Sequence, residues 1–511
     1  MQNNDKKVLL RISNLKQYFP LKGGRFVKAN DGITLDIYEG ETFGLVGESG
    51  CGKSTLGRTI LQLYHQTYGR TMYYGRSLDD LAPKYVIDTV KNLKARRTKL
   101  RELEQKRDKL EAEYAKLSEK EQYAKHGELD TARKLAEDAL LDITKIVGGF
   151  LVVDDLDPVI AAYSKDYAIA RKLSSMEEKR QELQVDVDDA EYAKKTAEEA
   201  GKSGKDDQLQ KAQEKLKQCD EQIAALRAQL DAGRKEIEAL RAPYANDPEF
   251  QKYEAYRDDG IDLARLEYNE MRRLRRDMQL IFQDPYSSLN PRMSVGQIIS
   301  EGMQAHNMIK KKDARMQEMV LKIMDDCGLA PYFLHRFPHQ FSGGQRQRIG
   351  IARALATKPK FVVCDEAVSA LDVSIQAQII NLLLDLKEQQ NLTYMFITHD
   401  LSVVKYISDR VGVMYLGTMV ELAAADEIFH HPIHPYTEAL LNAIPTTDTV
   451  GAKELSILEG DIPSPVNPPK GCKFHTRCKY CTEICTQVVP EWEEVRPNHF
   501  VACHHKLEAK E

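Results

Sequence analysis

The sequence predicts an α/β fold that is interrupted by a long helical insertion and followed by a small cysteine-containing domain. Short apolar runs such as TFGLV at 42–46 and FVVCD at 361–365 alternate with helix-forming stretches, which is typical of a mostly parallel sheet. Between them lies a stretch rich in Glu, Lys, Ala, Leu, Gln and Arg, and cysteines cluster near the end of the chain. We place the domain boundaries at residues 1–82, 83–266, 267–430 and 431–511.

Length and charge limit the classes of protein to consider. The 511 residues are enough for two or three domains, and no apolar run approaches the roughly 20 residues needed to span a bilayer. The net charge of −5 argues against a general nucleic-acid-binding surface. The N-terminus has no apolar run typical of a signal peptide, so we expect a cytosolic protein. In a reducing cytosol, clustered cysteines more often bind metal or act in catalysis than form disulfides.

The first domain contains the phosphate-loop pattern GESGCGKS at 47–54, directly after the strand-like run TFGLV. Glycines allow backbone N–H groups to surround phosphate oxygens, Lys53 supplies a positive charge, and the Ser54 hydroxyl can bind Mg²⁺. The pattern therefore predicts an ATP site with a magnesium ion. The residues assigned to it are Gly47, Glu48, Ser49, Gly50, Cys51, Gly52, Lys53, Ser54 and Thr55.

Two adjacent carboxylates end the apolar run at 361–365. Acids at the carboxyl end of a buried strand are expected to hold the metal ion in α/β nucleotide folds. Asp365 is therefore a candidate ligand of Mg²⁺ through water, and Glu366 a candidate general base.

The insertion carries two apolar series with alternating steps of three and four residues, which predicts helices with an apolar seam. The first series is Leu100, Leu103, Arg107, Leu110, Tyr114 and Leu117, and the second is Leu209, Ala212, Leu216, Cys219, Ile223, Leu226, Leu230, Gly233, Ile237 and Leu240. Two such arms favour one antiparallel coiled-coil hairpin, with the apolar, Gly- and Pro-containing stretch 146–163 as its tip. A compact helical bundle is the alternative, because heptad spacing does not identify what packs against the seam.

Several motifs resemble those of ABC-transporter ATPases and occur in that family's order. FSGGQRQR at 341–348 is similar to the signature motif, IFQDP to the Q-loop, SALD to the D-loop and ITHD to the switch-histidine motif. The resemblance implies that ATP lies between the phosphate loop of one subunit and the signature of another. It assigns Gln283 and His399 to catalysis beside Glu366, and Gln283 also to the magnesium ion. It adds the ATP-binding residues Phe19 (or Tyr18 in its place), Ser342, Gly343, Gly344, Gln345 and Asp372.

Longer sequence stretches are similar to those of ATP-binding subunits of oligopeptide and dipeptide importers, and most similar to the F-type subunit. Examples are QDPYSSLNPRMSVGQII at 283–299 and HPIHPYTEALLNAIP at 431–445. The resemblance implies a heterodimer with a homologous D-type ATPase subunit, two transmembrane permease subunits and an extracytoplasmic solute-binding protein. It implies a location on the cytoplasmic face of the cell membrane and ATP-driven import of peptides. Nickel, glutathione or another small solute is the alternative cargo, because the binding protein and the permease select it.

The insertion of roughly 180 residues separates this chain from the usual family pattern, and its partner is not indicated by the sequence. SMC-like DNA-associated ATPases also interrupt an ABC ATPase with a coiled coil. Against that class stand the short insertion, the absence of a C-x-x-C hook in its middle and the acidic charge. No nucleic acid is expected as a partner.

The C-terminal stretch GCKFHTRCKYCTEIC at 471–485 contains four cysteines. Taken alone, four thiols at this spacing suit a zinc ion. The family resemblance implies a different set, in which Cys472, Cys478, Cys485 and the later Cys503 hold a [4Fe–4S] cluster and Cys481 is not a ligand. Thiolate ligation suits that cluster type, and zinc remains the alternative.

Overall fold

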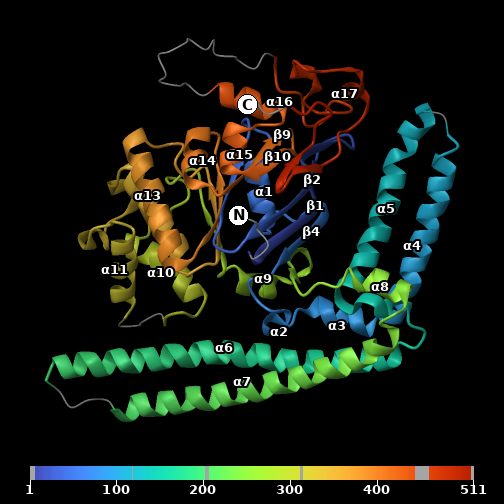
Figure 1. Ribbon diagram of the computed structural model, residues 1–511. Coiled ribbons are helices and arrows are strands. Elements are labelled where there is room, and N and C mark those ends of the chain that lie inside the picture. Colours follow the sequence, from blue (N-terminus) through green and yellow to red (C-terminus); the bar gives the residue numbers. More distant parts are fainter. Residues whose placement is uncertain (1–5, 118, 202–205, 311–314, 444–459, 508–511) are drawn as a thin grey trace. The chain divides into compact units, whose positions relative to one another are not determined.

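The computed structural model describes residues 6–117, 119–201, 206–310, 315–443 and 460–507. The chain forms two compact units (Figure 1). Unit 1 comprises Met1–Thr71 and Arg272–Glu511, and unit 2 is Met72–Met271. Unit 2 thus begins about ten residues before the predicted start of the insertion at residue 83. Among the described helices, none has the length and apolarity required to cross a membrane.

The main sheet of unit 1 has eight strands in the order β11-β12-β10-β9-β3-β8-β7-β6. The strands are β3 (Thr42–Val46), β6 (Met278–Ile281), β7 (Phe361–Asp365), β8 (Thr393–Ile397), β9 (Arg410–Tyr415), β10 (Thr418–Ala424), β11 (Glu493–Arg496) and β12 (His499–Val501). Strands β9, β3, β8, β7 and β6 are parallel, as the apolar runs predict. Their carboxyl ends therefore meet at one edge of the sheet.

Helices surround this sheet and bury its apolar runs. They are α1 (Lys53–Ile60), α10 (Val295–Ala305), α11 (Met316–Asp326), α12 (Gly343–Leu355), α13 (Val373–Gln390), α14 (Leu401–Ile407), α15 (Ala425–His430), α16 (Pro435–Asn442) and α17 (Glu483–Gln487). The largest cluster joins helices α10 to α13 to strands β7 and β8 through fully buried residues such as Ile299, Ile349 and Phe396. This packing fixes the strand ends that carry the predicted site.

A second sheet has the order β2-β1-β4-β5. Its strands are β1 (Val8–Pro20), β2 (Phe26–Tyr38), β4 (Tyr68–Tyr73) and β5 (Ile261–Asp262). Strands β1 and β2 form an antiparallel hairpin in which Phe19 pairs with Val27. The hairpin thereby presents the aromatic residues 18 and 19 near its turn.

The cysteine-containing region belongs to unit 1 and does not form the separate small domain that we expected. Strand β12 pairs with β10, with Glu421 opposite Val501, so the region extends the main sheet. The buried His499 ring lies 2.7 Å from the Glu421 carboxylate. Edge-strand pairing, which amino-acid composition does not reveal, joins the region to the sheet.

Unit 2 contains two helical hairpins, and the prediction of a single hairpin is wrong. Its helices are α2 (Leu78–Leu81), α3 (Lys84–Lys91), α4 (Leu93–Tyr114), α5 (Glu119–Val147), α6 (Asp157–Glu199), α7 (Asp206–Arg241) and α8 (Pro248–Glu254), while α9 (Tyr268–Leu274) crosses the unit boundary. Helix α4 packs against α5, and α6 against α7 (Figure 1). The two arms with heptad spacing therefore each pair with a neighbouring helix and not with each other.

The stretch 146–163 is the centre of unit 2, so its prediction as a hairpin tip is also wrong. It holds a 3₁₀ helix (Gly148–Val152) whose Phe150 is fully buried. Phe150 packs edge-on against Phe250 of α8, with ring centroids 5.7 Å apart, in a cluster that also draws on α4, α5, α6 and α7. The stretch is apolar because it supplies the core where the two hairpins meet.

Replacing Phe250 by alanine is expected to destabilise unit 2 by about 3–5 kcal/mol, because it leaves a cavity among packed aromatic rings. Its side chain is 1% exposed and also stacks on Tyr244. Hydrogen exchange or denaturant unfolding followed within unit 2 measures the effect. Leu135→Ala on α5, where the residue is 44% exposed, is the matched control and should change little. Equal effects of the two variants would show that this aromatic cluster is not the core of unit 2.

Candidate functional site

The predicted phosphate loop connects the end of β3 to the start of α1. Gly52 has a φ of 102°, and a Cβ at this position would lie 2.1 Å from the carbonyl oxygen of Ala29. Gly47 has a φ of 149°, and its Cβ would lie 2.2 Å from the carbonyl oxygen of Met414. Only glycine permits these backbone approaches. The sequence pattern is therefore explained by the closeness of the loop to neighbouring strands.

Lys53 lies inside this loop and is buried. Its Nζ donates to the carbonyl oxygens of Gly47 and Glu48, at 2.8 and 3.0 Å. The ammonium group is thus already surrounded by the backbone that the pattern predicts to bind phosphate. Cys51 is buried beside it, and burial raises the pKa of its thiol, so this cysteine stays protonated near neutral pH.

Two of the three predicted magnesium ligands, Ser54 and Asp365, lie side by side. The Ser54 hydroxyl donates to Asp365 Oδ1 at 2.5 Å, although 311 residues separate them in sequence. Asp365 is fully buried, and Arg58 donates to its other oxygen at 3.1 Å. A hydroxyl and a carboxylate in contact at a strand end are oxygen ligands of the kind that Mg²⁺ prefers. Arg58 had no signal in the sequence, because it lies within an ordinary helix.

The three predicted catalytic residues also meet. Gln283, just beyond β6, donates to Glu366 Oε2 at 2.6 Å, and His399 Nδ1, just beyond β8, lies 3.6 Å from Glu366 Oε1. Glu366 follows β7, which lies between β6 and β8 in the sheet. The parallel order of the strands therefore gathers residues from three distant segments around one carboxylate.

Glu366 has a left-handed backbone conformation, with a φ of 47°. This conformation is unfavourable for a residue other than glycine, by about 1–3 kcal/mol. It is held by a hydrogen bond from the Glu366 N–H to the carbonyl oxygen of Ile397, at 2.9 Å. Such strain is common at active sites and is consistent with a role for the carboxylate in chemistry.

The signature residues Ser342, Gly343, Gly344 and Gln345 open helix α12. The Ser342 hydroxyl accepts from the Gln345 N–H, and the Gln345 side chain accepts from the Ser342 N–H, forming a capping box. Ser342 and the D-loop residue Asp372 are exposed. Among the described residues, no hydrogen bond joins either of them to the phosphate loop of the same chain.

The aromatic candidates for adenine stacking lie on β1. Phe19 is half-buried and packs edge-on against Tyr64, with centroids 5.4 Å apart. Tyr18 donates its hydroxyl to Asp31 at 2.5 Å. The nearby Lys473 ammonium holds the pKa of Asp31 below its usual range, in spite of its burial.

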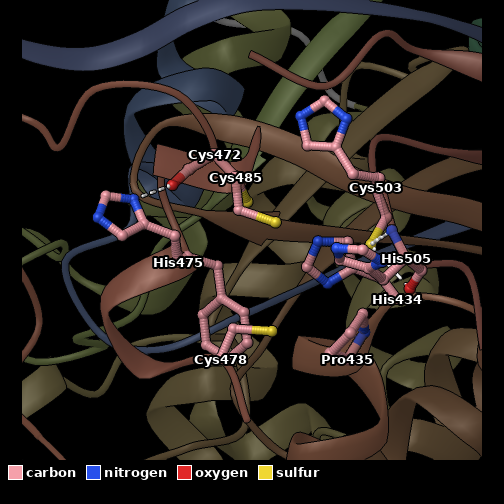
Figure 2. Close-up of a pocket in the computed structure, with 10 residues that line it drawn as sticks. His434, Pro435, Cys472, His475, Cys478, Cys485, Cys503 and His505 are labelled. Carbon is pink, nitrogen blue, oxygen red and sulfur yellow. Dashed lines mark hydrogen bonds between the residues drawn. The ribbon is translucent and has the colours of Figure 1, made fainter. Parts of the chain in front are cut away.

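The four cysteines implied by the family resemblance line one pocket. Cys472, Cys478, Cys485 and Cys503 line this pocket together with Phe474 and four histidines, and in Figure 2 the His475 ring points away from the sulfur atoms. Cys481 is exposed and is not among the lining residues. The fold brings residue 503 beside the 471–485 stretch, so the four cysteines share one pocket that does not include Cys481.

The pocket is lined by sulfur and imidazole groups and by no carboxylate. Each histidine has a ring nitrogen engaged elsewhere, as in the contact of His475 Nδ1 with the Cys472 carbonyl oxygen at 2.8 Å and of His505 Nε2 with the Thr482 hydroxyl at 2.6 Å. The thiols are thus the natural donor set. Among the described residues, no three His, Cys, Asp or Glu side chains are gathered as ligands of one metal ion.

Burial raises the pKa values of three of these thiols. The pKa of Cys472 is raised to about 11 and that of Cys503 to about 12, and the pKa of Cys478 is raised in the same direction. A bound metal centre would require the thiolate forms, so its binding would release protons. Without such a centre these three thiols are protonated near neutral pH.

Two further residues contact the phosphate loop and were not predicted. Arg477 donates two hydrogen bonds to the Glu48 carboxylate, and the Tyr436 hydroxyl accepts from the Glu48 N–H. Both belong to the C-terminal region, and they lie 429 and 388 residues from Glu48 in the sequence. No spacing rule links such distant residues, so only the folded chain reveals them.

Comparison with known proteins identifies the family. A family model described as ABC transporter matches residues 30–251 and 251–369, and a model described as oligopeptide/dipeptide transporter, C-terminal region, matches residues 420–485. The chain is 52% identical over 250 residues to the oligopeptide transport ATP-binding protein AppF of Bacillus subtilis, covering 48% of this chain and 75% of AppF. It is 54% identical over 245 residues to a putative peptide import ATP-binding protein of Brucella ovis, covering 48% and 77%.

A third relative matches nearly the whole chain. The putative oligopeptide transport ATP-binding protein YkfD of Bacillus subtilis is 34% identical over 498 residues, covering 97% of this chain and 95% of YkfD. An alignment of that length must include most of unit 2, so the helical insertion is shared with this relative. This chain belongs to the ABC transporter family, as an ATP-binding protein with the C-terminal region of the oligopeptide/dipeptide transporters.

Proposed function

We propose that this chain hydrolyses ATP to power the import of peptides through a membrane ABC transporter. The observation that carries the proposal is that Gln283 and His399 both contact the Glu366 carboxylate. These contacts lie at the edge of the main sheet from which the phosphate loop also emerges. This arrangement occurs in a chain whose C-terminal region matches that of oligopeptide/dipeptide transporters. The names of its relatives, which refer to peptide import and oligopeptide transport, support the cargo class.

The contacts suggest a division of labour within the site. Lys53 and the N–H groups of the phosphate loop would bind the phosphates. Ser54, Asp365 and Gln283 would hold Mg²⁺. When bound, Mg²⁺ offsets the negative charge of the phosphate oxygens. Glu366 would take the proton of the attacking water, while Gln283 and His399 hold the carboxylate in place. Phe19 would stack on adenine.

The exposed signature supports a nucleotide site completed by a second ATPase subunit. Ser342 and the N-terminus of α12 point to solvent, and a helix N-terminus preceded by a small hydroxyl residue favours an anion. We assign the complementary subunit to a homologous D-type chain, in a heterodimer. Asp372 lies at the start of α13, exposed as a residue at such an interface would be.

An exposed aromatic surface supports binding to the permease subunits. Tyr286 and Tyr332 are 65% and 67% exposed, and the Arg346 guanidinium lies 5.0 Å from the centre of the Tyr286 ring. Tyr286 lies three residues after Gln283. Docking here would therefore reach the catalytic carboxylate through the Q-loop. The chain would lie on the cytoplasmic face of the membrane, with an extracytoplasmic binding protein supplying the solute.

The cysteine pocket supports a [4Fe–4S] cluster held by Cys472, Cys478, Cys485 and Cys503. All four thiols line one pocket, and thiolate ligation suits such a cluster. Zinc is the alternative metal for the same four cysteines. In unit 2, we interpret the helix pairs α4/α5 and α6/α7 as antiparallel coiled coils.

Transport in reconstituted vesicles tests this function. The chain, its D-type partner, the two permeases and the binding protein should take up a labelled peptide when ATP is supplied to the cytoplasmic side. The same assembly carrying Glu366→Gln in this chain is the matched control and should show strongly reduced uptake. Uptake of nickel or glutathione but not of peptides would contradict the cargo class, and DNA-stimulated ATPase activity without permeases would contradict transport altogether.

A further inference from the structure

Glu48 of the phosphate loop is held by the C-terminal region. Its carboxylate accepts two hydrogen bonds from the Arg477 guanidinium, at 2.7 and 3.0 Å, and its N–H donates to the Tyr436 hydroxyl at 2.9 Å. Two-point pairing of arginine with a carboxylate fixes orientation as well as distance. The conformation of the loop at this residue therefore depends on residues outside the nucleotide motifs.

Arg477 is itself rigidly placed. Its side chain is 4% exposed, and the Glu48 side chain is 21% exposed, so the pair is largely shielded from water. Arg477 ends the short 3₁₀ turn His475–Arg477, and its N–H donates to the Phe474 carbonyl oxygen at 3.0 Å. The Phe474 ring is packed between Tyr415 and Tyr436, with centroids 5.2 Å from each.

The turn that carries Arg477 lies between two of the pocket cysteines. Cys472 precedes it and Cys478 follows it, and both line the same pocket. At the start of the turn, the Cys472 N–H donates to the Cys485 carbonyl oxygen at 2.8 Å. The position of the guanidinium is therefore set by how these cysteines are held.

A second ion pair, made by Lys473 just before this turn, contacts strand β2. Lys473 donates to Asp31 Oδ2 at 3.1 Å and to the Leu416 carbonyl oxygen at 3.2 Å. Asp31 also accepts from Tyr18, the neighbour of Phe19. The stretch from Cys472 to Cys478 thus contacts both the phosphate loop and the β1–β2 hairpin, which carries Phe19, the candidate for adenine stacking.

We propose that Arg477 is a positioning residue for the phosphate loop, through which the cysteine pocket controls the affinity for ATP. The inference rests on the proposed nucleotide site and adds a form of regulation to it. Arg477 neutralises the Glu48 carboxylate, which otherwise would repel the bound triphosphate from within the loop. It also holds the loop in the shape that Gly47 and Gly52 permit. Because coupling between two sites is reciprocal, bound nucleotide would likewise stabilise the present arrangement of the stretch from Cys472 to Cys478.

Nucleotide affinity of the full-length chain tests the proposal. Titration calorimetry with Mg²⁺-ADP and with a non-hydrolysable ATP analogue should show binding weakened on the order of tenfold in Arg477→Ala, because the Glu48 carboxylate loses its charged hydrogen-bond partner. Arg477→Lys should recover part of the affinity, because it restores the charge without the two-point pairing. The matched control is Lys479→Ala, which removes the exposed ammonium that pairs with Glu438 in the same segment and should not change affinity.

A double-mutant cycle separates positioning from general damage to the fold. In a Glu48→Gln background the acid that repels phosphate is absent, so Arg477→Ala should weaken binding by less than about twofold. A tenfold effect in both backgrounds would overturn the role of this ion pair. If Arg477→Ala unfolds the chain, Arg477→Lys and Glu48→Gln still complete the comparison.

The link to the cysteine pocket has its own test. Cys478→Ser should weaken nucleotide binding in the wild-type background and have no further effect in Arg477→Ala, whereas Cys481→Ser should have none in either. Equal effects of Cys478→Ser in both backgrounds would show that the coupling does not pass through Arg477. Lys53→Ala tells the two hypotheses apart, because unchanged affinity in that variant would refute the nucleotide site itself. Weakened binding in Lys53→Ala with normal binding in Arg477→Ala would refute the positioning role alone.

Discussion

Replacing Glu366 by glutamine is expected to reduce ATP turnover at this chain's site by at least about 100-fold while leaving ATP binding intact. The amide has nearly the shape of the carboxylate but cannot accept the proton of the attacking water. Glu366 contacts Gln283 and His399, and neither the phosphate loop nor the Ser54–Asp365 pair depends on its charge. The Glu366→Gln variant should therefore bind ATP normally but hydrolyse it slowly.

Single-turnover hydrolysis and nucleotide titration on the assembled ATPase pair measure the two effects. Glu388→Gln on α13, an exposed carboxylate far along the same chain, is the control for the substitution itself. The D-type partner should carry an inactivating change of its own, so that its site does not mask the result. Normal turnover by Glu366→Gln under these conditions would contradict the assignment of Glu366 as the base.

Replacing Cys503 by serine is expected to abolish the proposed metal centre of the C-terminal region, whereas replacing Cys481 should leave it in place. Cys503 is 9% exposed and lines the pocket with Cys472, Cys478 and Cys485, while Cys481 points to solvent. Loss of one of four thiolates removes a quarter of the ligand set and opens the pocket to water. The two substitutions are chemically identical, so each serves as the control of the other.

Iron, sulfide and zinc analysis of anaerobically purified protein, with visible absorbance, measures this outcome. Iron and sulfide in equal amounts that disappear in Cys503→Ser would support the cluster. Zinc in their place would support the alternative metal with the same ligands. Retention of the centre in Cys503→Ser together with its loss in Cys481→Ser would show that the local spacing at 471–485 had indicated the correct ligands.

The motifs of the nucleotide site could be predicted because each is local. The phosphate loop needs glycines at fixed spacing for backbone reasons, and the acids after β7 follow from where buried parallel strands end. Their convergence, such as Gln283 with Glu366 and Ser54 with Asp365, follows from strand order in a parallel sheet. The family resemblance pointed to Gln283, and the strand order explains why its side chain reaches Glu366.

The insertion shows where a periodic pattern stops being informative. Positions such as Leu100, Ile223 and Leu230 are buried, as the heptad steps predict. A heptad, however, specifies an apolar seam and not its partner. Two hairpins meeting at Phe150 bury the same seams as one long hairpin, and packing at that centre decides between them.

By itself, the sequence determined the α/β class, the nucleotide motifs and the family resemblance, because these depend on residues that are close together in the chain or on strand ends. Only the tertiary structure decided which helices pair in unit 2, which cysteines share a pocket and how Arg477 reaches Glu48. Those contacts join segments separated by tens to hundreds of residues. They form because burial and charge pairing are satisfied in the folded chain as a whole, and no local pattern encodes them.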